Sequence, residues 1–233
     1  MSFGIKGISN DTSLFNALLW YRNYALSPTS VRNLISLYSE DPRADTTYPP
    51  YNINNNALSP YPTAYGTQWR RACAIGGDLV MVGQRRMMCE VMTNAASPVW
   101  SYRFNTRPWN VSEWDGIKHF VNVAFSFQNV SGLLGPAGAD GAAARRQVSE
   151  EVGQAYIRFV NAGNPNRGRG VVVKAESGNY KKGKGLSITW PKWNDGTGTL
   201  NLVFDAKGSF VENDDWRAQE IAYINTLSRE LLG

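Results

Sequence analysis

The segment PVWSYRF, at residues 98–104, carries the clearest secondary-structure signal in this sequence of 233 residues. Two sets of side chains alternate after the proline: Val99, Ser101 and Arg103 with Trp100, Tyr102 and Phe104. Alternation among aromatic and β-branched residues predicts a β-strand over 99–104. Because a lone strand leaves backbone N–H and C=O groups unpaired along both edges, this strand needs neighbours in a sheet.

The rest of the chain predicts few such neighbours. Short apolar runs predict strands at 187–190 and 200–204, and the run at 123–127 fits either a strand or a helix. Helical patterns predict helices at 14–22, 28–38, 67–95 with an interruption at Gly76-Gly77, 146–162, and after the capping pair Asp214-Asp215. Loops are expected at 42–66, 105–122, 132–145 and 163–185. The sequence therefore predicts an incomplete α/β fold that is rich in helices and has few sheet strands.

Composition excludes several classes of protein. Hydrophobic residues make up 42% of the chain and aromatic residues 12%, which excludes a disordered protein. The net charge of +5 permits acidic partners without indicating them. There is no apolar run of about 18 residues, so no transmembrane segment is expected. The N-terminus lacks the basic and apolar regions of a signal peptide.

The cysteine and histidine content argues against a metal site or a disulfide framework. The chain has one histidine, His119, and two cysteines, Cys73 and Cys89, so we expect no metal and no cofactor. On one straight helix the cysteines would lie about 24 Å apart, beyond the roughly 6 Å that a disulfide tolerates. A sharp bend at Gly76-Gly77 would change that, so their disulfide state stays open.

A basic stretch at residues 166–185 raises the question of nucleic-acid binding. Its cations are Arg167, Arg169, Lys174, Lys181, Lys182 and Lys184. Tyr180 is the one aromatic residue among them, and no phosphate-binding loop motif is present. We therefore expect a solvated loop and no nucleic-acid partner.

His119 is the one candidate for imidazole chemistry, in the sequence DGIKHF at 115–120. A loop histidine can act as a general base, and the alternative is a partly exposed histidine without a role. No nucleophile elbow of the form G-x-S-x-G accompanies it, because the serine motifs that begin at Gly7 and Gly185 lack the final glycine. A His-Gly-Gly-Gly oxyanion loop is also missing from the sequence.

Two long segments resemble a known family. GDLVMVGQRRMMCEVMTNAASPVWSYRFNTRPWN at 77–110 and GIKHFVNVAFSFQNVSGLLG at 116–135 are similar to the C-terminal part of fungal type-B carboxylesterases and lipases, the cholinesterase-like branch of the α/β-hydrolases. Further matching segments follow the family's order: GISNDTSLF at 7–15, AYIRFVNAGNPN at 155–166, TWPKW at 189–193 and DDWRAQEIAYIN at 214–225. The resemblance implies that residues 1–233 form the C-terminal portion of a single α/β-hydrolase domain.

The family hydrolyses carboxylic esters through a Ser–Glu/Asp–His triad, so the resemblance implies that role for His119. The acid position falls on Thr12, where the family usually has Asp-Glu-Gly and this chain has Asp11-Thr12-Ser13. A threonine cannot carry the charge that stabilises an imidazolium, and Asp11 substitutes only if the loop shifts by one residue. Related sequences often have Glu where this chain has Asn122. The nucleophile and the oxyanion hole would both precede residue 1.

Two explanations fit this pattern. The chain is either part of an esterase, inactive alone and taking an ester substrate once completed, or a degenerate homologue that serves as a non-catalytic binding module. Four aromatic residues near the histidine in sequence can line an acyl pocket or belong to the core: Trp109, Trp114, Phe120 and Phe125. The full-length family member is expected to be extracellular, and three sequons are candidates for glycosylation, although such triplets are common by chance: Asn10, Asn110 and Asn129.

Overall fold

The computed structural model describes residues 6–21, 25–38, 63–112, 115–129, 132–167, 172–174, 180–182 and 188–232. These residues form two compact units. Unit 1 comprises Met1–Ala95, Glu113–His119 and Asp215–Gly233, and unit 2 comprises Ala96–Ser112 and Phe120–Asp214. Across the described residues, no helix is both long enough and apolar enough to cross a membrane.

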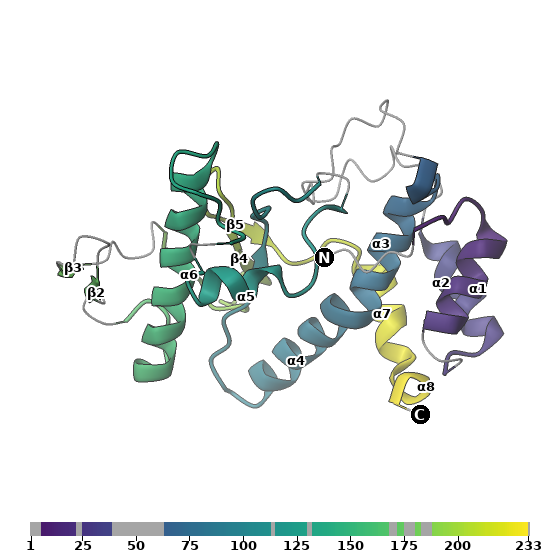
Figure 1. The fold of residues 1–233 in the computed structure, drawn as a ribbon. Helices are drawn as coiled ribbons and strands as arrows, with labels where there is room; N and C mark the ends of the chain where they lie inside the picture. Colours follow the sequence, from purple (N-terminus) through teal and green to yellow (C-terminus); the bar gives the residue numbers. More distant parts are fainter. Residues whose placement is uncertain are drawn as a thin grey trace. The chain divides into compact units, whose positions relative to one another are not determined.

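Unit 1 is helical (Figure 1). Its elements are α1 (Asp11–Tyr21), α2 (Pro28–Leu37), the short 3₁₀ turn η2 (Thr63–Tyr65), α3 (Trp69–Gly77), the π-helical turn η3 (Asp78–Val82), α4 (Gly83–Asn94), α7 (Ala218–Thr226) and α8 (Ser228–Leu232). Helix α2 begins where the sequence predicts, because Pro28 is its first residue and the Ser27 hydroxyl accepts the Ser30 N–H at 3.1 Å.

The predicted interruption at Gly76-Gly77 is wrong. Both glycines lie inside α3, and the irregular stretch is the π-helical turn that follows, between α3 and α4. A methyl group on Gly83, at the end of that turn, would lie 3.0 Å from the Ile224 side chain of α7. The glycine near this turn therefore permits the close approach of α7.

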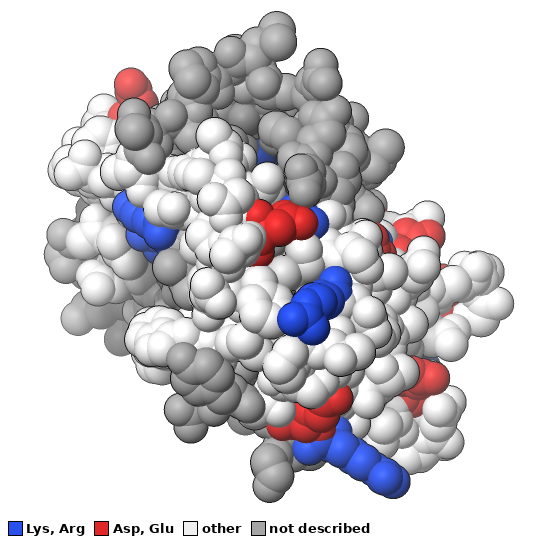
Figure 2. Space-filling model, turned by 90° about the vertical axis from the view of Figure 1, so that its right-hand side faces the viewer, with Lys and Arg blue, Asp and Glu red and all other residues white. Residues whose placement is uncertain are grey.

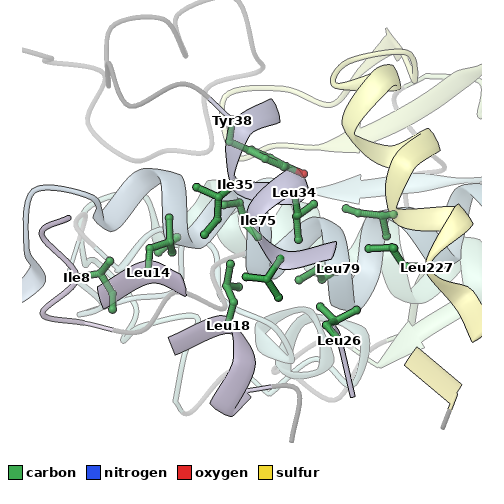
Figure 3. Packing of buried hydrophobic residues seen from close by; sticks show 13 residues of the cluster. Ile8, Leu14, Leu18, Leu26, Leu34, Ile35, Tyr38, Ile75, Leu79 and Leu227 are labelled. Atoms are coloured by element: carbon green, nitrogen blue, oxygen red, sulfur yellow. The ribbon is translucent and has the colours of Figure 1, made fainter. Parts of the chain in front are cut away.

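The core of unit 1 lies between α1, α2, α3 and α7 (Figure 3). The apolar stripe predicted for 28–38 supplies Val31, Leu34 and Ile35, and all three are buried. Other side chains gathered in this cluster are Ile8, Leu14, Leu18, Leu26, Tyr38, Ala72, Ile75, Leu79, Ile224 and Leu227. Each large aliphatic side chain buried in this way contributes about 1.5–3 kcal/mol.

Unit 2 combines helices with a small sheet. Its elements are β1 (Tyr102–Phe104), α5 (Val121–Ser126), α6 (Ala142–Ala162), β2 (Val172–Lys174), β3 (Tyr180–Lys182), β4 (Leu200–Phe204) and β5 (Phe210–Asn213). The sheet has the order β1-β4-β5, with β1 parallel and β5 antiparallel to β4. Strands β2 and β3 form a separate antiparallel pair. Helix α5 packs on α6, where the Ser149 hydroxyl donates to the Phe125 carbonyl at 2.6 Å.

Several expectations for unit 2 are corrected by the structure. The strand expected over 99–104 is shorter, because only Tyr102–Phe104 pair in the ladder. The ambiguous run at 123–127 falls in helix α5 and its C-cap. Helix α6 begins at Ala142, four residues before the predicted start at 146 (146 − 142). The loop expected at 163–185 contains β2 and β3.

Residues 188–190 are not a strand, although one was predicted at 187–190. The Asn166 side chain instead pairs with the backbone of Trp190, accepting its N–H at 2.8 Å and donating to its carbonyl at 2.8 Å. The strand at 200–204 is confirmed as β4, and β5 was not predicted. The N-cap residue of α7 is Arg217 rather than the predicted Asp214-Asp215 pair, and the Asp214 carboxylate accepts the Trp193 indole N–H at 2.8 Å.

Candidate active site

The segment Asp115–His119 carries the candidate histidine and belongs to unit 1. Gly116 adopts a φ of 61°, a left-handed conformation that favours glycine. Ile117 is buried, whereas the His119 side chain is exposed. The loop is therefore anchored in the protein two residues before the imidazole, which is itself accessible.

Asp115 ties this loop to two other segments of unit 1. Its Oδ1 accepts the Tyr65 hydroxyl at 3.0 Å and lies 3.5 Å from Lys6 Nζ. Its Oδ2 lies 2.9 Å from Lys118 Nζ. Burial raises the pKa of Asp115, but hydrogen bonds from Lys118 and Tyr65 and the two lysine charges lower it more, so the net pKa is below its usual value. The carboxylate is thus ionised at neutral pH and holds three groups together.

The turn that contains Tyr65 also holds the segment in which the resemblance predicts the acid. The Gly7 N–H donates to the Tyr65 carbonyl at 3.0 Å, and the Gln68 N–H donates to the Ile8 carbonyl at 2.9 Å. A methyl group on Gly66 would lie 2.2 Å from the Ile8 carbonyl oxygen, so only glycine fits there. The histidine loop and the segment leading to Asp11 therefore meet at one turn, residues 63–68.

The two acid candidates lie in the first turn of α1, and both are exposed. The Asp11 carboxylate accepts a hydrogen bond from Arg71 Nη1 at 2.5 Å, while Arg71 Nη2 donates to the Ile35 carbonyl at 2.8 Å. Asp11 is thus engaged by a buried guanidinium from α3. Thr12 offers no charge, so the assignment of the acid stays a prediction.

Asn122, where related sequences often have Glu, belongs to a hydroxyl network in unit 2. Its Nδ2 donates to the Tyr102 hydroxyl at 3.2 Å, and the hydroxyls of Tyr102 and Tyr156 lie 2.6 Å apart. Burial and the neighbouring Tyr156 raise the pKa of Tyr102 well above its usual value. Sequence reasoning missed Tyr156, because nothing local in α6 indicates a partner on β1.

The aromatic pocket candidates lie in different surroundings. Phe125 is completely buried, with its ring 4.8 Å from that of Phe104. Trp109 is partly exposed, and the Arg145 guanidinium lies 5.3 Å from its ring. Phe120 is exposed at the start of α5, and Trp114 lies outside the described residues. Their role in an acyl pocket stays a prediction.

The remaining candidates have defined positions. The three sequon asparagines, Asn10, Asn110 and Asn129, are all exposed. Cys73 and Cys89 are buried, and no disulfide joins them. Within the described ranges, no group of three His, Cys, Asp or Glu side chains is placed to hold a metal ion. On the face drawn in Figure 2, basic and acidic side chains are interspersed and separated by uncharged surface.

The comparisons with known proteins concern the fold. No protein-family model matches the sequence, and no curated protein matches it. Among solved structures, the crystal structure of Aspergillus niger EstA matches with a TM-score of 0.67 and 16% identity, over 98% of this chain and 38% of that chain. Two structures of the Geobacillus stearothermophilus carboxylesterase EST55, at pH 6.2 and 6.8, match at 18% and 19% identity with TM-scores of 0.46. Each match covers 90% of this chain, and 38% and 36% of the EST55 chains.

Identities this low establish a likeness of fold alone. The helix-rich chain with its small mixed sheet has the fold of part of an α/β-hydrolase. It spans 38% of the length of EstA.

Proposed function

We propose that this chain is the C-terminal portion of a type-B carboxylesterase or lipase of the fungal, cholinesterase-like branch, and that His119 is its triad histidine. The observation that carries the proposal is the combination of an α/β-hydrolase fold over 98% of the chain with an exposed His119 in an anchored loop. Coverage of only 38% of EstA supports a nucleophile and an oxyanion hole located elsewhere in the domain.

In the completed enzyme, His119 moves the protons of an acyl transfer. Its imidazole takes the proton of the serine hydroxyl as that oxygen attacks the ester carbonyl carbon. The same nitrogen then protonates the departing alcohol as its bond to the carbonyl breaks. Water repeats the two steps and releases the acid. Without the serine, the chain alone hydrolyses no ester.

A non-catalytic binding module or degenerate homologue is the second candidate. The observation that favours it is the acid position, where Thr12 has no charge and the Asp11 carboxylate is bound to Arg71. Replacement of the family's frequent Glu by Asn122, which is bonded to Tyr102, points the same way. An extracellular location belongs to the first proposal, and three exposed sequons support it: Asn10, Asn110 and Asn129.

The test joins this chain to the segment encoded immediately upstream of it. That segment is expected to contain G-x-S-x-G, and the joined protein is expected to hydrolyse p-nitrophenyl esters. His119→Ala should lower kcat by about 10⁴-fold or more. Lys207→Ala, in the exposed turn between β4 and β5, is the control and should leave kcat unchanged.

Two results would contradict the proposal. An upstream locus without a serine elbow would favour the degenerate homologue. Hydrolysis that persists in the His119→Ala variant would remove His119 from the mechanism, whatever the source of the serine.

A further inference from the structure

We infer that the hydrogen bond from Tyr65 to Asp115 positions the loop of His119 against the turn that also holds the acid-bearing segment. The inference rests on the proposed function of His119. Tyr65 and Asp115 are therefore positioning residues, since they act through the histidine rather than on the substrate.

Tyr65 provides a rigid point of attachment. Its ring packs edge-on against Trp69, with centroids 5.0 Å apart and an interplanar angle of 81°. Tyr65, Trp69 and Cys73 form a buried cluster of their own. The close approach of Gly66 to the Ile8 backbone fixes the next residue of the turn. The ring contact with Trp69 and the backbone contact at Gly66 thus restrict the position of the Tyr65 side chain.

The tyrosine bond is more sheltered than the two lysine contacts to Asp115. The Asp115 side chain is 15% exposed, whereas those of Lys6 and Lys118 are 49% and 44% exposed. Ion pairs of half-exposed lysines are screened by water and salt and contribute about 0–1 kcal/mol. A hydrogen bond to a charged acceptor in a sheltered site contributes more. The phenol therefore adds a sheltered hydrogen bond to the two more exposed lysine contacts that hold the carboxylate.

The contacts at Asp115 restrict His119 through the four-residue backbone segment 115–118 that precedes it. Lys118 returns to Asp115 from three residues away, so both ends of Asp115–Lys118 meet at one carboxylate. Ile117 is buried between them, and the left-handed Gly116 allows the tight path. His119 follows directly, so any loosening at Asp115 widens the range of imidazole positions.

The test uses Tyr65→Phe and Asp115→Asn in the 233-residue chain. His119 is the one histidine in the sequence, so its imidazole C–H protons give isolated NMR signals. Both variants should shift these signals at fixed pH and speed amide hydrogen exchange at residues 116–119 by about 10-fold or more, the equivalent of one hydrogen bond to a charged group. Tyr223→Phe is the matched control, because its hydroxyl donates to the Ser30 carbonyl at 3.3 Å. Asp115→Glu, which keeps the charge, should restore part of the protection.

A purely structural role would lower the free energy of unfolding and leave the His119 signals in place. Unchanged signals and unchanged exchange at 116–119 in both variants would overturn the inference. If Tyr65→Phe unfolds the chain, Asp115→Asn decides the matter, because it leaves the aromatic cluster intact.

The joined protein separates this inference from the proposed function. There, Tyr65→Phe should lower kcat by about 10- to 100-fold with KM within about twofold, as expected for a misplaced catalytic group. Full activity in that variant would overturn the positioning role and leave the esterase proposal standing. A joined wild-type protein without activity would overturn the esterase proposal, while the NMR and exchange measurements would still decide the positioning role.

Discussion

Replacing Asp78 by leucine should destabilise unit 1 far more than replacing Tyr38 by phenylalanine. Asp78 is the first residue of η3 and has no exposed surface. Its Oδ2 accepts Arg217 Nε at 2.5 Å and the Tyr38 hydroxyl at 2.9 Å, and its Oδ1 accepts Arg217 Nη2 at 2.8 Å. A single buried carboxylate thus joins α2, η3 and the start of α7.

The expected loss in the free energy of unfolding depends on which buried groups each substitution leaves without a partner. Asp78→Leu leaves the buried Arg217 guanidinium without its carboxylate, a loss of about 3–5 kcal/mol. Tyr38→Phe removes one hydrogen bond while both bonds from Arg217 remain, a loss of about 1.5 kcal/mol. The double variant Asp78→Leu/Arg217→Met removes both charges, so it should regain most of the stability lost in Asp78→Leu.

Urea unfolding measures these differences in the free energy of unfolding. Tryptophan fluorescence follows the unfolding, and Trp216, one of the eight tryptophans, lies next to the site, with the guanidinium of Arg217 4.4 Å and that of Arg86 4.7 Å from its ring. The reasoning is refuted if Asp78→Leu costs less than about 1 kcal/mol, the range of an exposed ion pair. It is also refuted if the losses in the free energy of unfolding from Asp78→Leu and from Arg217→Met, each measured alone, add up to the loss in the double variant.

Three further predictions concern single positions. Gly66→Ala should cost well over 1 kcal/mol in urea unfolding, because its φ is +78° and the added methyl meets a carbonyl oxygen at 2.2 Å; wild-type stability would show that the turn adjusts freely. Asn166→Asp should cost about 1–3 kcal/mol at pH 7, since it places a charged acceptor against the Trp190 carbonyl, and should recover at low pH. Burial, followed by the charge of Asp78, raises the pKa of Tyr38 well above 10, so the native state favours the neutral phenol. Its stabilising effect should be complete below about pH 10 and lost as the pH rises further, and a Tyr38→Phe variant with the same alkaline loss would exclude this group.

Local sequence signals predicted the elements whose stability is local. Helix α2 has its N-cap, its proline and its apolar stripe within ten residues, and β4 has an apolar run that is buried along most of its length. Strand β5 gave no signal because it is largely exposed, and pairing with β4 holds it in place. Asp214 gave a false signal because α7 begins four residues later (218 − 214), at Ala218, and the Asp214 carboxylate accepts a hydrogen bond from the indole of Trp193, 21 residues away.

In the candidate site, too, features with a local sequence signal were predicted and contacts between distant residues were not. His119 was singled out as the one histidine of the chain, in a segment that resembles the family, and the structure places it in a loop; its catalytic role stays a prediction. The hydrogen bond from Tyr65 to Asp115 was not predicted, since the two residues are 50 positions apart and no sequence periodicity links them. The π-helical turn η3 was likewise not predicted, because the contacts of Asp78 come from residues 40 and 139 positions away.

The bond between Asp11 and Arg71 allows the two candidates for the triad acid, Asp11 and Thr12, to be compared in energy. Loss of the acid's charge lowers turnover by about 10⁴-fold in serine-protease triads, or about 5.5 kcal/mol of barrier. Moving Asp11 to the acid position would break its bond to Arg71, whose side chain is 6% exposed, while that of Asp11 is 51% exposed. Because the guanidinium is buried, its bond to Asp11 contributes about 1–3 kcal/mol, which would reduce the population of the shifted loop by about 5- to 150-fold. Under the proposed function, breaking this bond costs less than lacking the charge, so we predict that Asp11 rather than Thr12 is the acid.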